Sequence, residues 1–374
     1  MTEKHAVKPD KPVKPATTGA AGRTGAAPAA GRAPMTPMRR LLILAVAVLL
    51  LAGLGTGFVL HAASRAADKD KPQAGGPAVG AGSVSLAHKR QLAFVNSAPG
   101  PRRTAVAVVS AARPDGARTA SDLKCARFYA AAGTGVCLQA GLGVVSQTNR
   151  AVILDAELHT RHTFALAGTP SRARVSPSGH FAAWTVFVGG ESYGAAFFST
   201  RTSIVDTRTW HLLPNLEEFA ITLNGQSYHA VDDNFWGVTF ATDDDTFYAT
   251  LGTAGKTYLV KGSISRRTIV STGAQNVECP SLSPDGTRIA FKKRVLAGAS
   301  LWHEYVLDLR TLHETPLAEH RSVDDQAAWL DDHTVAYALP SQGDTKSTDL
   351  WSVPADGSGS PHLLIRDASS PAAM

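Results

Sequence analysis

The stretch SLSPDGTRIAFKKR, residues 281–294, places a Pro-Asp-Gly corner between a short apolar run and an alternating one. Pro284 presets φ for the second position of a turn, Asp285 can hydrogen-bond the neighbouring backbone, and Gly286 closes the turn without a Cβ clash. The residues after the corner, 287–292, alternate polar and apolar side chains, as in a strand that buries one face. The stretch therefore predicts a hairpin.

The same pattern occurs at three other places in the chain. Each copy has a small apolar approach, an acid-rich or Gly-bearing turn, and an apolar alternation that ends near an aromatic residue. The copies are VSPSGHFAAW (175–184), FATDDDTFYA (240–249) and AWLDDHTVAY (328–337). The hairpin is therefore one unit of a repeat.

A second strand-turn-strand unit follows each of these copies. The second units are SIVDTRTWHLL from Ser203, YLVKGSISRRTIV from Tyr258, YVLDLRTLHETPL from Tyr305 and LWSVPADGSGSPHLL from Leu350. ILDAELHTRHTFAL from Ile153 resembles a second unit without a clear first half. Two hairpins in every 40 to 65 residues or so predict an all-β fold, a β-propeller of four-stranded blades.

Closure of the ring follows from the two apolar faces of a blade, which are hidden only when blades stack around an axis. Residues 86–135 have to supply the strands that the visible copies do not provide. We predict six blades, with five as the alternative. We also expect a terminal segment to close the ring by completing a mixed blade.

The N-terminal part of the chain differs in composition from the repeats. Residues 1–38 are rich in Ala, Pro, Gly, Lys and Arg, which predicts a disordered basic tail in the cytoplasm. Twenty uncharged residues, 41–60, follow Arg39 and Arg40 and are long enough to span a bilayer. We interpret residues 39–61 as an uncleaved transmembrane signal anchor, with a cleaved signal peptide as the alternative.

The remaining chain divides into a linker and a folded domain. Residues 62–85 are rich in Ala, Gly, Lys and Pro and predict a flexible linker. Residues 86–374 are then the propeller, which lies outside the cytoplasm and is held at the cell membrane by a single pass. Much of the formal charge of +6 sits on the tail, which favours contact with an anionic inner leaflet and argues against a nucleic-acid partner.

The chain has three cysteines. Cys125 and Cys137 have a spacing that a loop can close as a disulfide in an oxidising compartment, although other pairings stay open. Cys279 precedes a predicted buried strand and is interpreted as a core thiol. The absence of paired CxxC motifs argues against a zinc site.

These motifs carry a family resemblance. SLSPDGTRIAF, with the weaker SPSG, TDDD and LDDH copies and the LDLRT and VPADGSG hairpins, resembles the TolB-type, WD40-like (PD40) propeller repeat over roughly residues 90–367. The anchor, CARFYAAAGTGVCL and VECPSLSPDGTRIAFKKR resemble membrane-anchored TolB-like proteins of high-GC bacteria. The resemblance implies a non-enzymatic propeller that works by binding. It does not extend to the N-terminal α/β domain of periplasmic TolB, so it does not support a role in a Tol-Pal system.

One motif suggests catalysis. Residues 190–194, GESYG, fit the G-x-S-x-G nucleophile elbow, which needs a strand before it and a helix after it. The following AAFFSTRTSIVD is β-patterned, so we interpret the motif as a hairpin loop and expect no catalytic residues. A nucleophilic Ser192 would require His180, His211 or His229 to approach it.

Acidic residues precede several of the predicted innermost strands. The resemblance places these segments near one mouth of the central channel, where they could form a negative rim for a cationic peptide or a divalent ion. The candidates are Asp232, Asp233, Glu278, Asp324 and Asp325. The alternative is that they are solvated turns and strand caps, as we expect for the run Asp243 to Asp245. Lys292, Lys293 and Arg294 are expected to form an exposed strand edge.

The sequence thus predicts a membrane-anchored, extracytoplasmic propeller that binds an envelope protein, a peptide or a cell-wall ligand. We expect no enzymatic activity and no cofactor beyond the divalent ion considered for the rim. One alternative is a hydrolase or lyase with its active site in the channel. Another is an envelope sensor that signals through the N-terminal tail, whose phosphorylation at Thr17, Thr18, Thr24 or Thr36 would favour that role. The oligomeric state is not fixed by the sequence.

Overall fold

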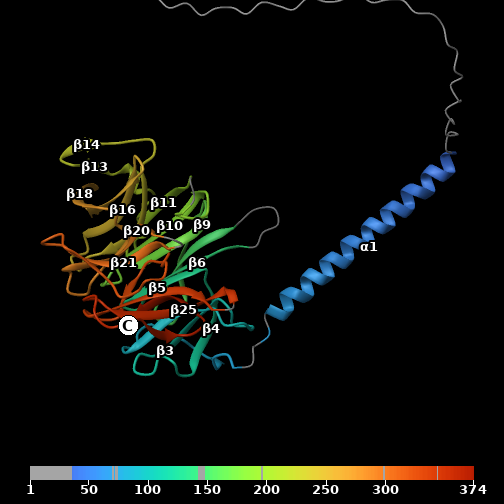
Figure 1. The fold of residues 1–374 in the computed structure, drawn as a ribbon, viewed down its shortest axis with the longest axis horizontal. Helices are drawn as coiled ribbons and strands as arrows, with labels where there is room; N and C mark the ends of the chain where they lie inside the picture. The colour runs from blue at the N-terminus through green and yellow to red at the C-terminus, as the bar shows by residue number, and fades with distance from the viewer. Residues whose placement is uncertain are drawn as a thin grey trace, which may run out of the picture. The chain divides into compact units, whose positions relative to one another are not determined.

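The computed structural model describes residues 36–69, 71, 75–141, 148–194, 197–297, 300–342 and 344–374 (Figure 1). The chain divides into two units, residues 1–64 and 65–374, which are described separately. The tail predicted for residues 1–38 lies outside the described residues, apart from its last three.

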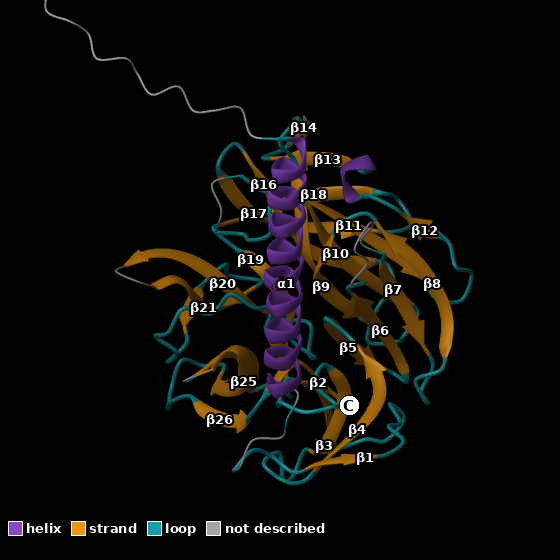
Figure 2. Ribbon diagram, turned by 90° about the vertical axis from the view of Figure 1, so that its right-hand side faces the viewer, coloured by secondary structure: helices purple, strands orange, loops and turns teal. Residues whose placement is uncertain are grey.

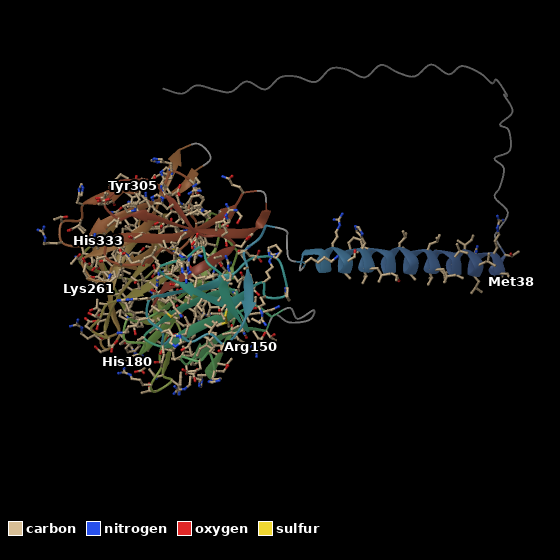
Figure 3. The ribbon with its side chains drawn as sticks, turned by 90° about the horizontal axis from the view of Figure 1, so that it is seen from below. Met38, Arg150, His180, Lys261, Tyr305 and His333 are labelled. Carbon is tan, nitrogen blue, oxygen red and sulfur yellow. A yellow bond between two sulfur atoms is a disulfide. The ribbon has the colours of Figure 1, made fainter. Side chains whose placement is uncertain are left out.

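A long helix, α1 (Pro37–Lys69), makes up nearly all of the described part of the first unit. The helix ends at Lys69, five residues after the last residue of that unit, Ser64. The 29 residues Pro37–Arg65 have a mean hydropathy of 2.6, and their side chains project from the helix without being buried (Figure 3). At 1.5 Å per residue this stretch exceeds the ~30 Å core of a bilayer. It is a candidate membrane anchor.

The segment predicted as a flexible linker, 62–85, is partly ordered. Helix α1 continues to Lys69, because the Ala-rich run 62–67 favours helix. Strand β1 (Val79–Ala81) then pairs in parallel with β4 (Arg118–Lys124), and Val84 is buried. A three-residue strand bordered by Gly and Pro shows too little alternation to be recognised in the sequence.

The strands of the second unit form six sheets, which are the blades of a propeller (Figure 2). Blade 1 contains β2 (Gln91–Asn96), β3 (Ala105–Ser110), β4 and β27 (Ala368–Ala373), with β1 at its outer edge. Blade 2 contains β5 (Arg127–Ala131), β6 (Thr134–Gln139), β7 (Asn149–Leu154) and β8 (Thr160–Leu166). Blade 3 contains β9 (Thr169–Val175), β10 (Phe181–Gly189), β11 (Ser199–Asp206) and β12 (Leu212–Leu213).

The other three blades have the same antiparallel order. Blade 4 contains β15 (Asn234–Phe240), β16 (Thr246–Thr253), β17 (Lys256–Ser263) and β18 (Thr268–Gln275), extended by β13 (Ala220–Leu223) and β14 (Gln226–Tyr228) after the short 3₁₀ helix η1 (Leu216–Glu218). Blade 5 contains β19 (Glu278–Leu282), β20 (Arg288–Ala297), β21 (Ser300–Asp308) and β22 (Glu314–Pro316). Blade 6 contains β23 (Ala328–Trp329), β24 (Thr334–Ser341), β25 (Asp344–Pro354) and β26 (His362–Ile365). The prediction of six blades is confirmed.

The ring closes through a mixed blade, as expected. The C-terminal strand β27 pairs with β2, with Leu92 opposite Ala373 and Asn96 opposite Ala368. On its two sides β27 contacts β23 and β5, the innermost strands of blades 6 and 2. The first and last parts of the folded unit therefore share one sheet, which prevents the ring from opening at its ends.

The repeated corners lie between the first and second strands of their blades. Gly179, Asp244 and Gly286 have φ of +78°, +56° and +71°, so three corners use the same left-handed position. Blade 2 has the corresponding turn at Ala132 and Gly133, with φ of +48° and +72°. The sequence did not reveal this first half, because the turn has neither Pro nor Asp.

The apolar core lies between neighbouring blades. Phe181, Phe240 and Phe247 belong to one buried cluster that joins blades 3 and 4. Ala290, Trp329 and Tyr337 belong to another that joins blades 5 and 6. Each blade therefore buries both faces against its neighbours, which is the reason given above for ring closure.

The innermost strands surround the channel in the order β5, β9, β15, β19, β23, β27. Side-chain contacts join the starts of these strands, for example Arg127 Nε to Ser171 O at 2.8 Å and Arg172 Nε to Cys279 Sγ at 3.4 Å. The innermost strands thus run in one direction. We call the end of the channel where they begin the N-terminal mouth, and the end where they finish the C-terminal mouth.

Candidate functional site

A cluster of charged and aromatic residues fills the N-terminal mouth. At its centre Lys292 of β20 is fully buried, and its Nζ lies 2.5 Å from Asp324 Oδ1 and 3.6 Å from Glu278 Oε2. The same nitrogen lies 4.6 Å and 4.0 Å from the ring centres of Tyr193 and Trp302. Lys292 is therefore held by two carboxylates and two aromatic faces.

The expectation that Lys292 lies on an exposed edge was wrong. Ala290 and Lys292 share the face of β20 that is covered by blade 6, as the cluster of Ala290 with Trp329 shows. Lys293, on the other face, pairs with Glu314 and is only partly exposed. Arg294 lies near the surface, with Nε 3.6 Å from Glu278 Oε1. The three basic residues form ion pairs within blade 5 and toward its neighbour.

Arg172 connects this cluster to blade 3. Its Nη2 donates to Asp324 Oδ1 at 3.2 Å, and its guanidinium lies 4.9 Å from the centre of the Tyr193 ring. The Tyr193 hydroxyl in turn lies 2.7 Å from Ser171 Oγ. Burial opposes ionisation of Asp324, but the positive charges of Lys292 and Arg172 lower its pKa. Asp324 is thus an ionised bridge between two buried cations.

Glu304 differs from the other carboxylates. It lies opposite Lys292 in the β20–β21 ladder and is 1% exposed. Neither of its carboxylate oxygens accepts a hydrogen bond from the described residues. Burial, and then the negative charge of Asp325, raise the pKa of Glu304 to about 8. This carboxyl group is mostly protonated at neutral pH.

Cys279 is buried in the same cluster, next to Arg172. Burial raises the pKa of its thiol, so it is a poor nucleophile in the folded chain. Cys125 and Cys137 form a disulfide in blade 2. The structure therefore has the Cys125–Cys137 disulfide that the sequence favoured, and it leaves Cys279 as a buried free thiol.

The structure separates the five predicted rim carboxylates. Glu278 and Asp324 flank Lys292, and Asp325 Oδ2 accepts a hydrogen bond from Ala338 N at 3.1 Å. Asp232 instead accepts from Ala254 N at 2.7 Å, and Asp233 accepts from Ala230 N at 2.8 Å. These two cap turns in and before blade 4, which was the alternative interpretation. A purely acidic rim does not form, because neighbouring cations pair with Glu278 and Asp324.

Side chains also fill the channel inside this mouth. Gln326 Nε2 donates to Val238 O at 3.1 Å and to Pro280 O at 2.9 Å, which joins three innermost segments. Arg172 and Arg174 extend into the same space and leave a hollow of about 20 Å³. That volume holds about one water molecule. The alternating arginines of SRARV, residues 171–175, are a signal in the sequence that could have indicated these channel residues.

The GESYG segment lies in the loop between β10 and β11, as interpreted from the sequence. These strands are antiparallel neighbours, so the strand-turn-helix context of a nucleophile elbow is absent from this described segment. Ser192 Oγ accepts from Gly194 N at 3.1 Å, and no described histidine hydrogen-bonds to it. His180 Nδ1 instead lies 2.6 Å from Asp244 Oδ2 at the C-terminal mouth.

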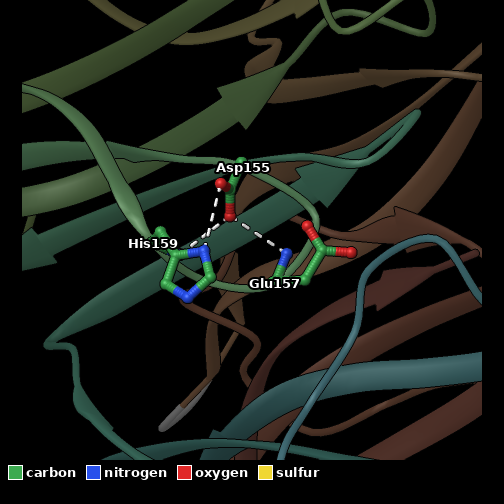
Figure 4. A group of neighbouring side chains, drawn as sticks. All are labelled: Asp155, Glu157 and His159. Atoms are coloured by element: carbon green, nitrogen blue, oxygen red, sulfur yellow. Dashed lines mark hydrogen bonds and ion pairs between the residues drawn. The ribbon is translucent and has the colours of Figure 1, made fainter.

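Asp155, Glu157 and His159 gather in the turn between β7 and β8 (Figure 4). Asp155 Oδ1 accepts from Glu157 N at 3.0 Å and from His159 N at 2.8 Å. Burial acts to raise the pKa of Asp155, but the hydrogen bonds from the backbone of His159 and Glu157, together with the His159 side chain, outweigh burial and lower that pKa. Asp155 is thereby engaged as a turn cap, which accounts for the grouping without a bound ion.

The C-terminal mouth carries a larger hollow, of about 660 Å³. It is formed by the segment before blade 1 and by turns of blades 2 and 3. Its lining includes Leu86, His88, Lys89, Gly133, Asp155, Glu157, Arg161, Thr207, Trp210 and Met374. The Trp210 ring stacks on His162 at 4.9 Å, which fixes the indole at the edge of the hollow. No local pattern in the sequence indicates this surface, because its residues come from five separate segments of the chain.

Comparison with known proteins agrees with this architecture. The chain is similar to TolB from Acinetobacter baumannii, with a TM-score of 0.51 and 16% identity. The fold is that of a TolB-like β-propeller. The match covers 75% of this chain and 66% of that TolB chain, so the present chain spans slightly less than two thirds of it. At this identity the similarity establishes the fold alone.

Two further solved structures are similar at lower scores. The putative TolB from Agrobacterium tumefaciens has a TM-score of 0.46 and 9% identity, covering 76% of this chain and 92% of its own. A puromycin-hydrolyzing peptidase from Mycobacterium tuberculosis has a TM-score of 0.45 and 13% identity, covering 71% of this chain and 42% of its own. No family model matches the sequence, and no curated protein matches it.

Proposed function

We propose that the chain is a membrane-anchored, extracytoplasmic binding module without enzymatic activity, and that its ligand binds at the C-terminal mouth. The observation that carries this proposal is the contrast between the two ends of the channel. The hollow at the C-terminal mouth measures about 660 Å³, within the usual ~300–1,000 Å³ of ligand sites. The hollow behind the N-terminal mouth, bordered by Arg127, Arg172 and Arg174, measures about 20 Å³.

The bonding of the polar residues also favours binding over catalysis. Lys292 and Arg172 are engaged with Asp324, and Ser192 bonds its own loop. A nucleophile needs a base within hydrogen-bond reach and a substrate within contact, and Ser192 has no such base among the described side chains. Non-enzymatic binding is therefore the function that these groups support best.

Two features support the proposed location. Helix α1 is long and apolar enough to anchor the chain, and Arg39 and Arg40 at its start favour a cytoplasmic N-terminus. The disulfide between Cys125 and Cys137 suits an oxidising compartment. Together they favour a single-pass protein with its propeller outside the cytoplasm.

The chemistry of the hollow favours an envelope protein, a peptide or a cell-wall ligand. Lys89 and Arg161 lie in its lining together with Asp155 and Glu157, so both signs of charge are present. Trp210 adds an aromatic edge of the kind enriched at protein-binding surfaces. A nucleic-acid site would instead require a surface of largely positive charge.

Site-specific photocrosslinking of the full chain in source membranes tests the proposal. A photoreactive phenylalanine analogue replaces Thr207 in the hollow or, as the control, exposed Arg310 in a turn of blade 5. We expect a discrete adduct from position 207 that is absent from position 310 and is lost when Trp210→Ala is added. Equal thermal stability of the variants would show that the loss is local. Identical adducts from both positions, or none from position 207, would contradict the proposed surface.

A further inference from the structure

The hollow inside the N-terminal mouth is lined by more cations than carboxylates. Arg127 of β5 and Arg172 and Arg174 of β9 all border it. Asp325 is the one carboxylate among the described lining residues. The other lining residues are aromatic, apolar or neutral, from β5, β9, β27 and the segment before β23.

Arg174 has no acidic partner among the described residues. Arg174 is 5% exposed, and its Nη2 donates a hydrogen bond to Ala327 O at 3.0 Å. The guanidinium lies 4.2 Å from the centre of the Tyr129 ring, and its buried Nε has no hydrogen-bond acceptor in the described chain. The buried guanidinium of Arg174 thus has a carbonyl acceptor for Nη2 but none for Nε, and no carboxylate pairs with its charge among the described residues.

Arg127 adds a second guanidinium without a carboxylate. Its Nε donates to Ser171 O at 2.8 Å, and the described residues form no ion pair with it. Burial, and next the positive charge of Arg172, lower the pKa of Arg127. The arginines of β5 and β9 are therefore close enough to repel one another.

The nearby carboxylates are already engaged. Asp324 lies between Lys292 and Arg172, and Asp325 Oδ2 accepts from Ala338 N. Glu304, opposite Lys292, is mostly protonated at neutral pH because burial raises its pKa to about 8. Three arginines border the hollow and one carboxylate, Asp325, lies in its lining, so a negative group from outside the chain would bring the charges closer to balance.

We propose that the hollow bordered by Arg127 and Arg174 binds one small monovalent anion. The volume of about 20 Å³ holds about one water-sized group, which suits a monatomic ion or one end of a carboxylate better than the larger phosphate or sulfate. A guanidinium donates through several N–H groups in a fixed plane, which suits both a halide and a carboxylate. The anion is either a free ion or the carboxylate of a ligand that reaches into the mouth. This site is separate from the hollow at the C-terminal mouth and does not depend on the function proposed for it.

Thermal unfolding of the full chain in detergent tests the site. Methanesulfonate, whose tetrahedral sulfonate group is about as large as sulfate, serves as the background salt and is replaced at constant ionic strength by chloride, bromide, formate or sulfate. An anion that binds only the folded state raises Tm in proportion to the logarithm of its concentration once that exceeds its Kd, by roughly 5 °C at 100 times its Kd. We expect this rise with chloride, bromide or formate and not with sulfate. Arg174→Met should abolish it, whereas Arg310→Met, at an exposed position, should retain it.

The outcomes separate the two sources of the anion. A rise with both halides and formate supports a site for a free anion, and a rise with formate alone supports a site for a carboxylate group. An equal rise in the wild type and Arg174→Met, or no rise in the wild type with chloride, bromide or formate, would overturn the proposal. If Arg174→Met does not fold, Arg127→Met is the second variant. Broadening of the chloride-35 resonance by the wild type, reversed by formate, is then the direct measurement for the halide.

Discussion

The two mouths of the channel are built from the same repeat, yet their polar groups behave differently. At the N-terminal mouth the starts of the innermost strands converge, and Lys292, Asp324 and Arg172 bond across blades 3, 5 and 6. At the C-terminal mouth the polar residues of the corners bond both within their own turns and to the corner of the next blade, as His180 Nδ1 does to Asp244 Oδ2 at 2.6 Å. Asp285, for example, accepts from Thr287 N at 3.0 Å.

This difference indicates which partners a charged side chain needs at each end of the channel. Near the axis little space is left for solvent, so a charged side chain needs a partner from another blade. At the corners the polar groups lie nearer solvent, so hydrogen bonds within the turn or to the neighbouring corner are sufficient. The N-terminal mouth should therefore respond strongly to changes of charge, and the C-terminal mouth mainly to changes of backbone conformation.

Lys292→Met gives the largest effect that we expect. The substitution keeps much of the volume but leaves Glu278 and Asp324 without their shared cation. Breaking a buried ion pair by removing one partner costs about 3–5 kcal/mol. Chemical denaturation of the full chain, followed by tryptophan fluorescence, measures the change in the free energy of unfolding.

Lys261→Met is the matched control, because Lys261 is exposed on β17 of blade 4. Its change in unfolding free energy should lie within about 0.5 kcal/mol of zero. Similar losses for Lys292→Met and Lys261→Met would mean that Lys292 is not held as the contacts indicate.

Glu304→Gln tests the charge sensitivity of the N-terminal mouth, because the effect of this substitution on the free energy of unfolding should depend on pH. In the unfolded chain this carboxyl group has a pKa near 4.5, and in the folded chain its pKa is about 8. Between these values the folded state holds a proton that the unfolded state has released. The free energy of unfolding of the wild type therefore falls as pH rises, by about 1.4 kcal/mol per pH unit from this group.

Glutamine keeps the shape of the side chain and removes the titration. The difference in stability between Glu304→Gln and the wild type should thus grow from pH 5 to pH 8, in favour of the variant. Denaturation midpoints at pH 5, 6, 7 and 8 measure this difference. Glu157→Gln, in the exposed turn between β7 and β8, is the control and should show no such trend. A constant difference across this range would show that Glu304 is ionised in the folded chain.

The sequence predicts the fold well because the corners are local. Ser283, Asp285 and Gly286 determine a turn through their own bonds and torsions, and copies of that turn reveal the repeat before any blade contacts are known. The mixed blade follows from the same counting, since the strands near residues 86–135 need a partner.

The site could not be predicted to the same extent. Lys292, Lys293 and Arg294 look like an exposed edge in a single strand, and only the packing of blade 6 on blade 5 shows that Lys292 is buried. Asp232 and Glu278 occupy similar places before an innermost strand, yet one caps a turn and the other pairs with Lys292. These outcomes depend on the angle at which blades meet, which no local pattern encodes.

Gly286→Val has the smallest expected effect and tests the C-terminal mouth. Gly286 has φ +71°, and a Cβ added there would meet no atom within 4 Å. The cost therefore comes from the backbone alone, and for a β-branched residue we expect on the order of 1 kcal/mol or more. Asn tolerates this conformation better, and Asp244 occupies the equivalent position of blade 4 with φ +56°. Gly286→Asn should consequently lose less stability than Gly286→Val in thermal unfolding. Equal losses would point to a side-chain clash, and an unchanged Tm for Gly286→Val would contradict the left-handed turn at this corner.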